Sequence, residues 1–316
     1  MINVASGHTL NIYVKKGSTG KLVAKGGDNN AGIGSIENVY AGNINIHGGT
    51  IEATGGQYGA GIGGGNHRGF DVAASQGGLT IYAGNVTATG GEYGAGIGSG
   101  DRGKCENIYI GGNSTVVKAT AYGYGYAIGT GASRDGNFNI VITGGDITAN
   151  GSENGAGIGS GDGGSFDGTI EISGGTIHAY SGKDATTEEV LGHGAGIGGG
   201  LSLQREMHGK IIISGGTITA ESRGGAGIGG GEGGILAEDC SIEITGGTID
   251  AKSKEGGAIG AGYHFLTESD GETHGLIYRA YCYGKINISG NPSINLYTSN
   301  ERYHYTPIEI HTRQGR

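Results

Sequence analysis

The stretch G-A-G-I-G-G-G occupies residues 59–65 and returns at residues 194–200 and 225–231. Degenerate copies extend the series to eight, and every copy keeps the central isoleucine and the glycine that follows it. Neighbouring isoleucines lie 29 to 39 residues apart, and a recurrence of this length is the signature of a solenoid. The marker isoleucines are Ile33, Ile62, Ile97, Ile128, Ile158, Ile197, Ile228 and Ile259.

A second block of the repeat consists of two segments of alternating apolar and polar residues, joined by Gly-Gly. Residues 44–53, I-N-I-H-G-G-T-I-E-A, are a typical copy, and their period of two predicts half-buried strands. The marker isoleucine adds a third short strand, and no segment has the 3.6-residue period of a helix. The sequence therefore predicts an all-β fold, a single-stranded, right-handed parallel β-helix of eight to nine coils of roughly 30 residues.

The repeat runs through almost the whole chain, so we expect residues 1–316 to form one β-helix domain. Within it, residues 1–30 are expected to form an irregular first coil. Residues 263–284 are expected to form a long loop insertion, and residues 297–316 a C-terminal cap or domain end. Insertions in a solenoid collect on one face, which is often the binding face.

Composition excludes several classes of partner. The net charge is -9 and we find no cluster of Lys and Arg, so we expect neither a nucleic acid nor an anionic membrane as partner. The glycine stretch satisfies G-x-G-x-x-G, but the dinucleotide motif must open a helix, and none is expected here. Cys240 and Cys282 precede corresponding strands of neighbouring repeats, which allows either one disulfide or two buried free thiols.

Acidic residues recur four positions after the marker isoleucine, among them Asp101 and Asp162. Three interpretations remain open for them: solvated turn positions, ligands of Ca²⁺, or an acid/base pair. Asp101 and Asp162 are therefore the calcium candidates, and no other cofactor is expected. Arg102, Lys104 and Arg134 lie near Asp101 and Asp135 in the sequence; these bases suit either a calcium-dependent polysaccharide lyase or ordinary surface salt bridges.

Tyrosines recur four positions before the marker isoleucine. Tyr58, Tyr93 and Tyr124 occupy this position on consecutive coils, and Asn154 and His193 follow on the next two. The coil spacing is close to the length of one sugar unit in an extended β-linked glycan, and tyrosine offers both an apolar ring and a hydroxyl. These five residues are the candidate ligand-binding residues. The alternative is a structural stack in a corner of the coil, with Tyr58 pointing inward.

The glycines of the heptapeptide suggest a surface beside the tyrosines. If Ile62 points inward, strand parity places Gly59, Gly61 and Gly63 on the outside of the coil. A persistent outward column of glycine indicates that something approaches the backbone closely, either a packed loop or a flat ligand. We therefore expect the glycines to form the floor of a shallow groove.

The blocks I-S-G-G-T-I at residues 172–177 and 213–218, together with G-A-G-I-G-G-G, resemble a known family. They are similar to the β-helical carbohydrate-binding modules found beside xylanase domains in gut bacteria. The resemblance implies a non-catalytic module that binds plant cell-wall polysaccharide, most simply xylan or a related β-glycan. It also implies a secreted bacterial protein with a covalently attached glycoside hydrolase. The alternatives are a β-helical polysaccharide lyase or glycoside hydrolase using Asp101, Asp162 and Arg102, and a surface adhesin or phage tail-spike protein.

Overall fold

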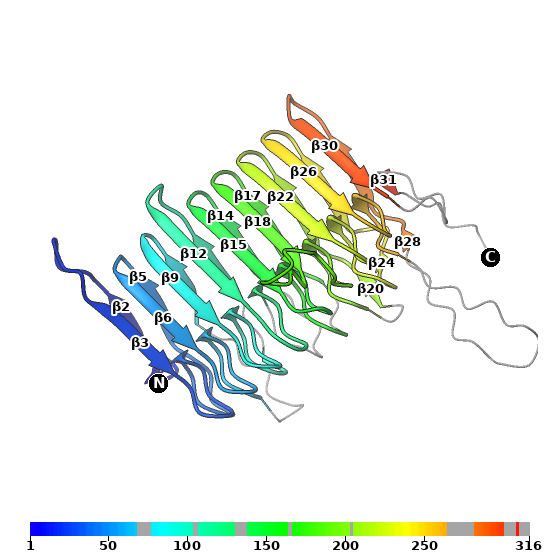
Figure 1. The fold of residues 1–316 in the computed structure, drawn as a ribbon. Helices are drawn as coiled ribbons and strands as arrows, with labels where there is room; N and C mark the ends of the chain where they lie inside the picture. The colour runs from blue at the N-terminus through cyan, green and yellow to red at the C-terminus, as the bar shows by residue number, and fades with distance from the viewer. Residues whose placement is uncertain are drawn as a thin grey trace, which may run out of the picture.

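The computed structural model is a β-solenoid whose coils stack along one axis (Figure 1). It describes residues 1–67, 77–103, 107–129, 138–163, 166–202, 205–263, 281–299 and 308–309. In this part of the chain all regular structure is strand, and no helix long and apolar enough to cross a membrane is present. All strand pairs of the four sheets are parallel, and each joins corresponding strands of neighbouring coils.

Three long sheets form the sides of the solenoid, and a short fourth sheet lies beside them. The first sheet is built from two-residue strands at the marker isoleucines, and the other two from the strands before and after Gly-Gly. The first sheet contains β1 (Ile2–Asn3), β4 (Ile33–Gly34), β7 (Ile62–Gly63), β10 (Ile97–Gly98), β13 (Ile128–Gly129), β16 (Ile158–Gly159), β19 (Ile197–Gly198), β23 (Ile228–Gly229), β27 (Ile259–Gly260) and β31 (Ile308–Glu309). The second contains β2 (Thr9–Ile12), β5 (Asn43–Ile46), β8 (Leu79–Ile81), β11 (Asn107–Ile110), β14 (Asn139–Ile142), β17 (Thr169–Ile172), β21 (Lys210–Ile213), β25 (Ser241–Ile244) and β29 (Lys285–Ile288).

The third sheet faces the viewer in Figure 1 and contains β3 (Lys21–Lys25), β6 (Thr50–Thr54), β9 (Gly84–Thr89), β12 (Thr115–Thr120), β15 (Asp146–Gly151), β18 (Thr176–Ser181), β22 (Thr217–Ser222), β26 (Thr248–Ser253) and β30 (Ser293–Thr298). The fourth contains β20 (Glu206–Met207), β24 (Ile235–Leu236) and β28 (Tyr281–Cys282). The prediction of an all-β parallel β-helix is confirmed. Its right-handedness stays a prediction.

The core is a set of aliphatic columns that run along the axis. Ile46, Ile81 and Ile110 lie in register on β5, β8 and β11 and are fully buried. Burying such a side chain stabilises the fold by about 1.5–3 kcal/mol, and each coil contributes several. Because the strands are only two to six residues long, it is this repetition that makes the solenoid stable.

The first coil is more regular than expected. β1, β2 and β3 pair in register with β4, β5 and β6, so the first coil supplies a strand to each long sheet. Its irregularity lies at the corner between β2 and β3, where residues 13–20 replace the usual Gly-Gly. Most of the predicted insertion, residues 264–280, and most of the predicted C-terminal cap lie outside the described residues.

The heptapeptide forms a narrow re-entrant loop around the two-residue strand β7, and it is not extended along its whole length. The Ala60 N–H donates to the Gly64 carbonyl of the same coil at 2.9 Å, and Ala95 makes the same bond to Ser99 at 3.0 Å. This bond folds the chain back on itself, with Ile62 at the apex and its side chain in the core. We call Ile62 and its equivalents the apex isoleucines.

The expected glycine floor is wrong, because the re-entrant loop buries its glycines. Gly59, Gly61 and Gly63 are all buried, and a Cβ on Gly61 would lie 2.7 Å from the carbonyl oxygen of Gly96 on the next coil. The prediction assumed that side chains alternate between inside and outside, which holds only for an extended strand. The glycines allow neighbouring coils to touch backbone to backbone, so they leave no open surface for a ligand.

Candidate functional site

The re-entrant loops bring two columns of side chains together at the surface. The residue four positions before each apex isoleucine is here called the leading residue, and the one four positions after it the trailing residue. The Asp101 N–H donates to the Tyr58 carbonyl at 2.8 Å, and the Glu232 N–H donates to the His193 carbonyl at 2.8 Å. Asn66, Leu201 and Tyr263 make the same bond, so on five coils the trailing residue is bonded to the leading residue of the preceding coil. The tyrosine column and the acidic column, noted separately in the sequence, form one continuous site.

The leading tyrosines form a ladder. The ring centroids of Tyr58 and Tyr93 lie 5.1 Å apart at an interplanar angle of 12°, and those of Tyr93 and Tyr124 lie 5.1 Å apart at 13°. None of the three belongs to the core, and Tyr124 is 39% exposed. The alternative in which Tyr58 points inward is therefore wrong. Burial, with a smaller contribution from Glu92, raises the pKa of the Tyr93 phenol, so its hydroxyl stays neutral and can donate and accept hydrogen bonds.

The stacking also determines which ring surfaces face outward. Tyr93 has a tyrosine ring against each face, so it presents its edge and hydroxyl to solvent. Tyr124 stacks only on Tyr93, and the next leading residue is the shorter Asn154. The outer face of Tyr124 is thus the face of the ladder most open to solvent.

Two trailing carboxylates flank the ladder. Burial raises the pKa of Asp101, against the opposing effect of Arg102, whose Nε lies 3.8 Å from Asp101 Oδ2. Burial also raises the pKa of Asp162, against the opposing effect of a hydrogen bond from Asn154. Asp101 and Asp162 belong to coils two apart, which separates them by about 10 Å along the axis. Both carboxyl groups are therefore partly buried, Asp162 beside Asn154 of its own coil and Asp101 beside Tyr58 of the preceding coil.

No group of three or more His, Cys, Asp or Glu residues suited to a metal ion occurs in the described part of the chain. Calcium binding by Asp101 or Asp162 stays a prediction. Lys104, Arg134 and Asp135, the charged neighbours noted in the sequence, lie outside the described residues.

Arg102 has an unusual backbone conformation. Its φ is +54°, and the equivalent position of other coils holds Asn38 with φ +57°, Gly163 with φ +67° and Gly233 with φ +71°. Asparagine and glycine tolerate this left-handed conformation, whereas arginine has no such advantage and costs about 1 kcal/mol or more there.

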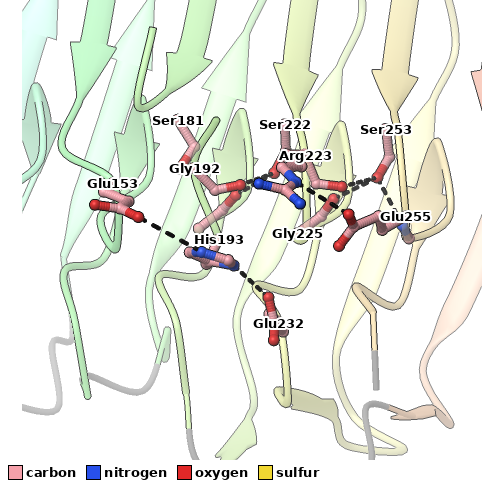
Figure 2. Close-up of polar contacts among 12 residues, drawn as sticks. Glu153, Ser181, Gly192, His193, Ser222, Arg223, Gly225, Glu232, Ser253 and Glu255 are labelled. Atoms are coloured by element: carbon pink, nitrogen blue, oxygen red, sulfur yellow. Dashed lines mark hydrogen bonds and ion pairs between the residues drawn. The ribbon is translucent and has the colours of Figure 1, made fainter. Parts of the chain in front are cut away.

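His193, the fifth candidate ligand-binding residue, lies in a charged cluster on the same face (Figure 2). Its Nδ1 contacts the Glu232 carboxylate, and its Nε2 lies 3.7 Å from Glu153 Oε1. The hydrogen bond to Glu232 raises the pKa of His193. The leading residue of the next coil is Gly224, and a Cβ there would collide with the Glu232 carboxylate, so this glycine makes room for the His193–Glu232 pair.

A second aromatic ladder was not predicted from the sequence. Tyr13, His47 and Tyr82 directly follow β2, β5 and β8, and Tyr109 continues the series from β11. The Tyr13 and His47 rings stack at 4.4 Å, His47 and Tyr82 stack at 4.9 Å, and Tyr82 meets Tyr109 at 6.0 Å with a tilt of 48°. The sequence held a signal for this ladder, because the residue after the segments L-N-I (10–12), I-N-I (44–46) and L-T-I (79–81) is Tyr, His and Tyr on the first three coils.

The fold and the repeat geometry define a parallel β-helix, and comparison with known proteins agrees. Six stretches are similar to the family described as the beta helix repeat, and each ends at a trailing residue. No curated protein and no solved structure matches the chain. The six stretches are residues 44–66, 79–101, 140–162, 170–201, 211–232 and 242–263.

Proposed function

We propose that this protein is a non-catalytic carbohydrate-binding module that recognises plant cell-wall polysaccharide, most simply xylan or a related β-glycan. The observation that carries the proposal is the ladder of Tyr58, Tyr93 and Tyr124, whose rings repeat every 5.1 Å on consecutive coils. An extended β-linked glycan repeats at a similar interval, so each coil meets one sugar unit.

Contact with the glycan uses ring edges and polar groups along the ladder. The hydroxyl groups of the three tyrosines form a row of hydrogen-bond donors and acceptors suited to sugar hydroxyls. At the end of the ladder one sugar ring stacks on the open face of Tyr124, the geometry in which aromatic rings contribute most. Asn154 and Asp162 lie on the next coil and supply hydrogen bonds to the same sugar.

In this proposal the module acts by tethering. A covalently attached glycoside hydrolase, in a secreted bacterial protein, is held near insoluble substrate, and its effective local concentration rises without new chemistry. The resemblance to modules found beside xylanases supports this role.

The experiment is a comparison of two exposed tyrosines two residues apart. Tyr124→Ala removes the open end of the ladder, whereas Tyr122→Ala removes a side chain that is 60% exposed and belongs to neither ladder. We expect Tyr124→Ala to weaken retention in a native gel containing soluble xylan by about tenfold, and Tyr122→Ala to leave it unchanged. Both variants keep their melting temperature within a few degrees. Equal retention of the two variants would contradict the proposal.

A second candidate function is cleavage of the polysaccharide at Asp101. The raised pKa of this carboxyl and the strained φ of the adjacent Arg102 favour it, because shifted acids and strained residues concentrate in active sites. The same xylan incubations distinguish the two functions. Release of reducing ends or of unsaturated products by the wild type, abolished by Asp101→Asn, would replace the binding module with an enzyme.

A further inference from the structure

Charge is distributed unevenly along the solenoid. The first 27 residues contain Lys15, Lys16, Lys21 and Lys25 and no Asp or Glu, although the whole chain has a net charge of -9. The expectation that the chain lacks a basic cluster is therefore wrong for the first coil. An anionic ligand is repelled by most of this protein and attracted to one end of it.

The basic coil contains a surface cavity. Its volume is about 230 Å³, and it lies between the wide corner of the first coil and the Gly48–Gly49 corner of the second. A Cβ on Gly48 would lie 2.9 Å from Val14 Cγ1, so the bare corner of the second coil is what admits the longer first corner. The cavity has the size of one sugar unit and is too small for a glycan chain. It is lined by Ile12, Tyr13, Val14, Lys15, Ser18, Gly20, Lys21, Leu22, Gly48, Gly49, Thr50 and Ile51.

Two lysines line this cavity in different electrostatic states. The Lys21 ammonium lies 2.8 Å from Glu52 Oε1, so its charge is largely compensated. Lys15 is exposed and makes no ion pair within the residues that the structure describes. Lys15 is thus the available partner for a ligand anion, and Ser18 supplies a neutral hydroxyl beside it.

One wall of the cavity belongs to the second aromatic ladder. Tyr13 is 71% exposed, and its ring is held by stacking on His47 with an interplanar angle of 5°. His47 covers the face of the Tyr13 ring toward the second coil, so the ring edge and the opposite face remain exposed, and Tyr13 lines the cavity. A rigid aromatic face beside a cation suits a ligand that has both an apolar ring surface and a negative charge.

We propose that the first-coil cavity binds a carboxylate-bearing sugar, a uronate, and that its carboxylate pairs with Lys15 while its ring packs against Tyr13. The proposal rests on the function proposed above, since it takes the ligand to be a glycan. It adds a second subsite, far from Tyr124 along the axis, that selects polysaccharides carrying acidic side groups. Uronate units on an otherwise neutral xylan backbone have this chemistry.

The test compares a glucuronate-substituted xylo-oligosaccharide with the same oligosaccharide after reduction of its carboxyl group. We expect the full chain to bind the charged form about tenfold more tightly by calorimetry, because the ion pair is lost on reduction. Lys15→Gln abolishes this preference, and Tyr13→Ala weakens binding of the charged form. The matched controls Lys118→Gln and Tyr122→Ala, two exposed residues outside the cavity, leave the preference intact.

Two results would overturn the uronate assignment. One is equal affinity for the charged and reduced forms in the wild type; the other is displacement of the charged form by equimolar sulfate, which would leave only a general anion site. The two proposals fail separately. Loss of neutral xylan binding in Tyr124→Ala, with no effect of Lys15→Gln on the preference, refutes the cavity alone. The opposite outcome refutes the ladder alone: the wild type is not retained by neutral xylan, yet it prefers the charged oligosaccharide and loses this preference in Lys15→Gln.

Discussion

The glycine after each apex isoleucine is the most constrained residue of the repeat. At Gly129 the φ is +148°, and a Cβ would collide with the carbonyl oxygen of Gly159 on the next coil. Both conditions exclude an L side chain, the first through backbone strain and the second through steric overlap. This position is glycine in all eight copies because the coils are stacked at backbone contact distance.

Gly129→Ala therefore lowers the free energy of unfolding by about 4 kcal/mol, the combined cost of strain and overlap. Gly163→Ala is the matched control, because Gly163 has φ +67° and no atom lies within 4 Å of the place that a Cβ would take. This variant incurs the backbone strain alone, about 1 to 2 kcal/mol. Urea-induced unfolding midpoints measure both values, and equal losses would show that overlap between coils contributes nothing.

His193 gives the solenoid a pH-dependent contact. Glu232 raises the pKa of His193 above its ordinary 6.5 in the folded state, so their attraction is fully present below that value and is lost as the pH rises through the folded pKa. We expect the difference in melting temperature between the wild type and Glu232→Gln to be larger near pH 6 than near pH 9. The exposed pair of His208 and Asp239 is present in both proteins and cancels. A difference that stays constant with pH would show that the pair is not ionic.

At the scale of elements, strands and loops differ in how far the sequence predicts them. Strands such as Ser241–Ile244 and Thr248–Ser253 can be predicted from the alternation of apolar and polar residues. Their pairing can be predicted too, because corresponding residues of neighbouring coils lie in register. The re-entrant loop does not follow, since it depends on a bond within one coil, from Ala60 to Gly64, that leaves no period in the sequence. The strand alternation rule therefore placed the heptapeptide glycines on the outer surface, whereas they are buried between coils.

The candidate site was predicted in its parts but not in its arrangement. Tyr93 and Asp101 were each identified from their distance to the marker isoleucine. That both belong to one continuous site could not be predicted, because the re-entrant loop brings Asp101 against the Tyr58 carbonyl of the preceding coil. The aromatic ladder at Tyr13 and Tyr82 was missed for a different reason, since the first coil has a longer corner and does not align simply with the others.

At the scale of the whole molecule, stability is distributed over contacts between neighbouring coils, so a buried group in one of the last coils reports on the packing there. Two thiols report on this end of the molecule. Cys240 and Cys282 are both buried and both free, and burial raises the pKa of Cys240 to about 12. Of the two alternatives that the sequence left open, the structure contains free thiols.

In a Cys105→Ser background, we expect Cys240 and Cys282 to resist alkylation by iodoacetamide at mildly alkaline pH, because a protonated, buried thiol is a poor nucleophile. Both react fully in concentrated urea without a reductant. Mass spectrometry counts the labels. Failure of labelling in urea until a reductant is added would instead demonstrate a disulfide.

The basic first coil also makes the solenoid an electric dipole. Its first 27 residues carry four positive charges against a total of -9, so the remaining coils carry -13. The positive end of the dipole is the first coil, and its direction follows the long axis. Near an anionic surface, such a molecule turns its first coil toward that surface, within the roughly 8 Å over which charges act at physiological salt. The tyrosine ladder is parallel to the solenoid axis, so in this orientation it runs perpendicular to the surface. A polymer chain that extends outward from the surface would run in the same direction.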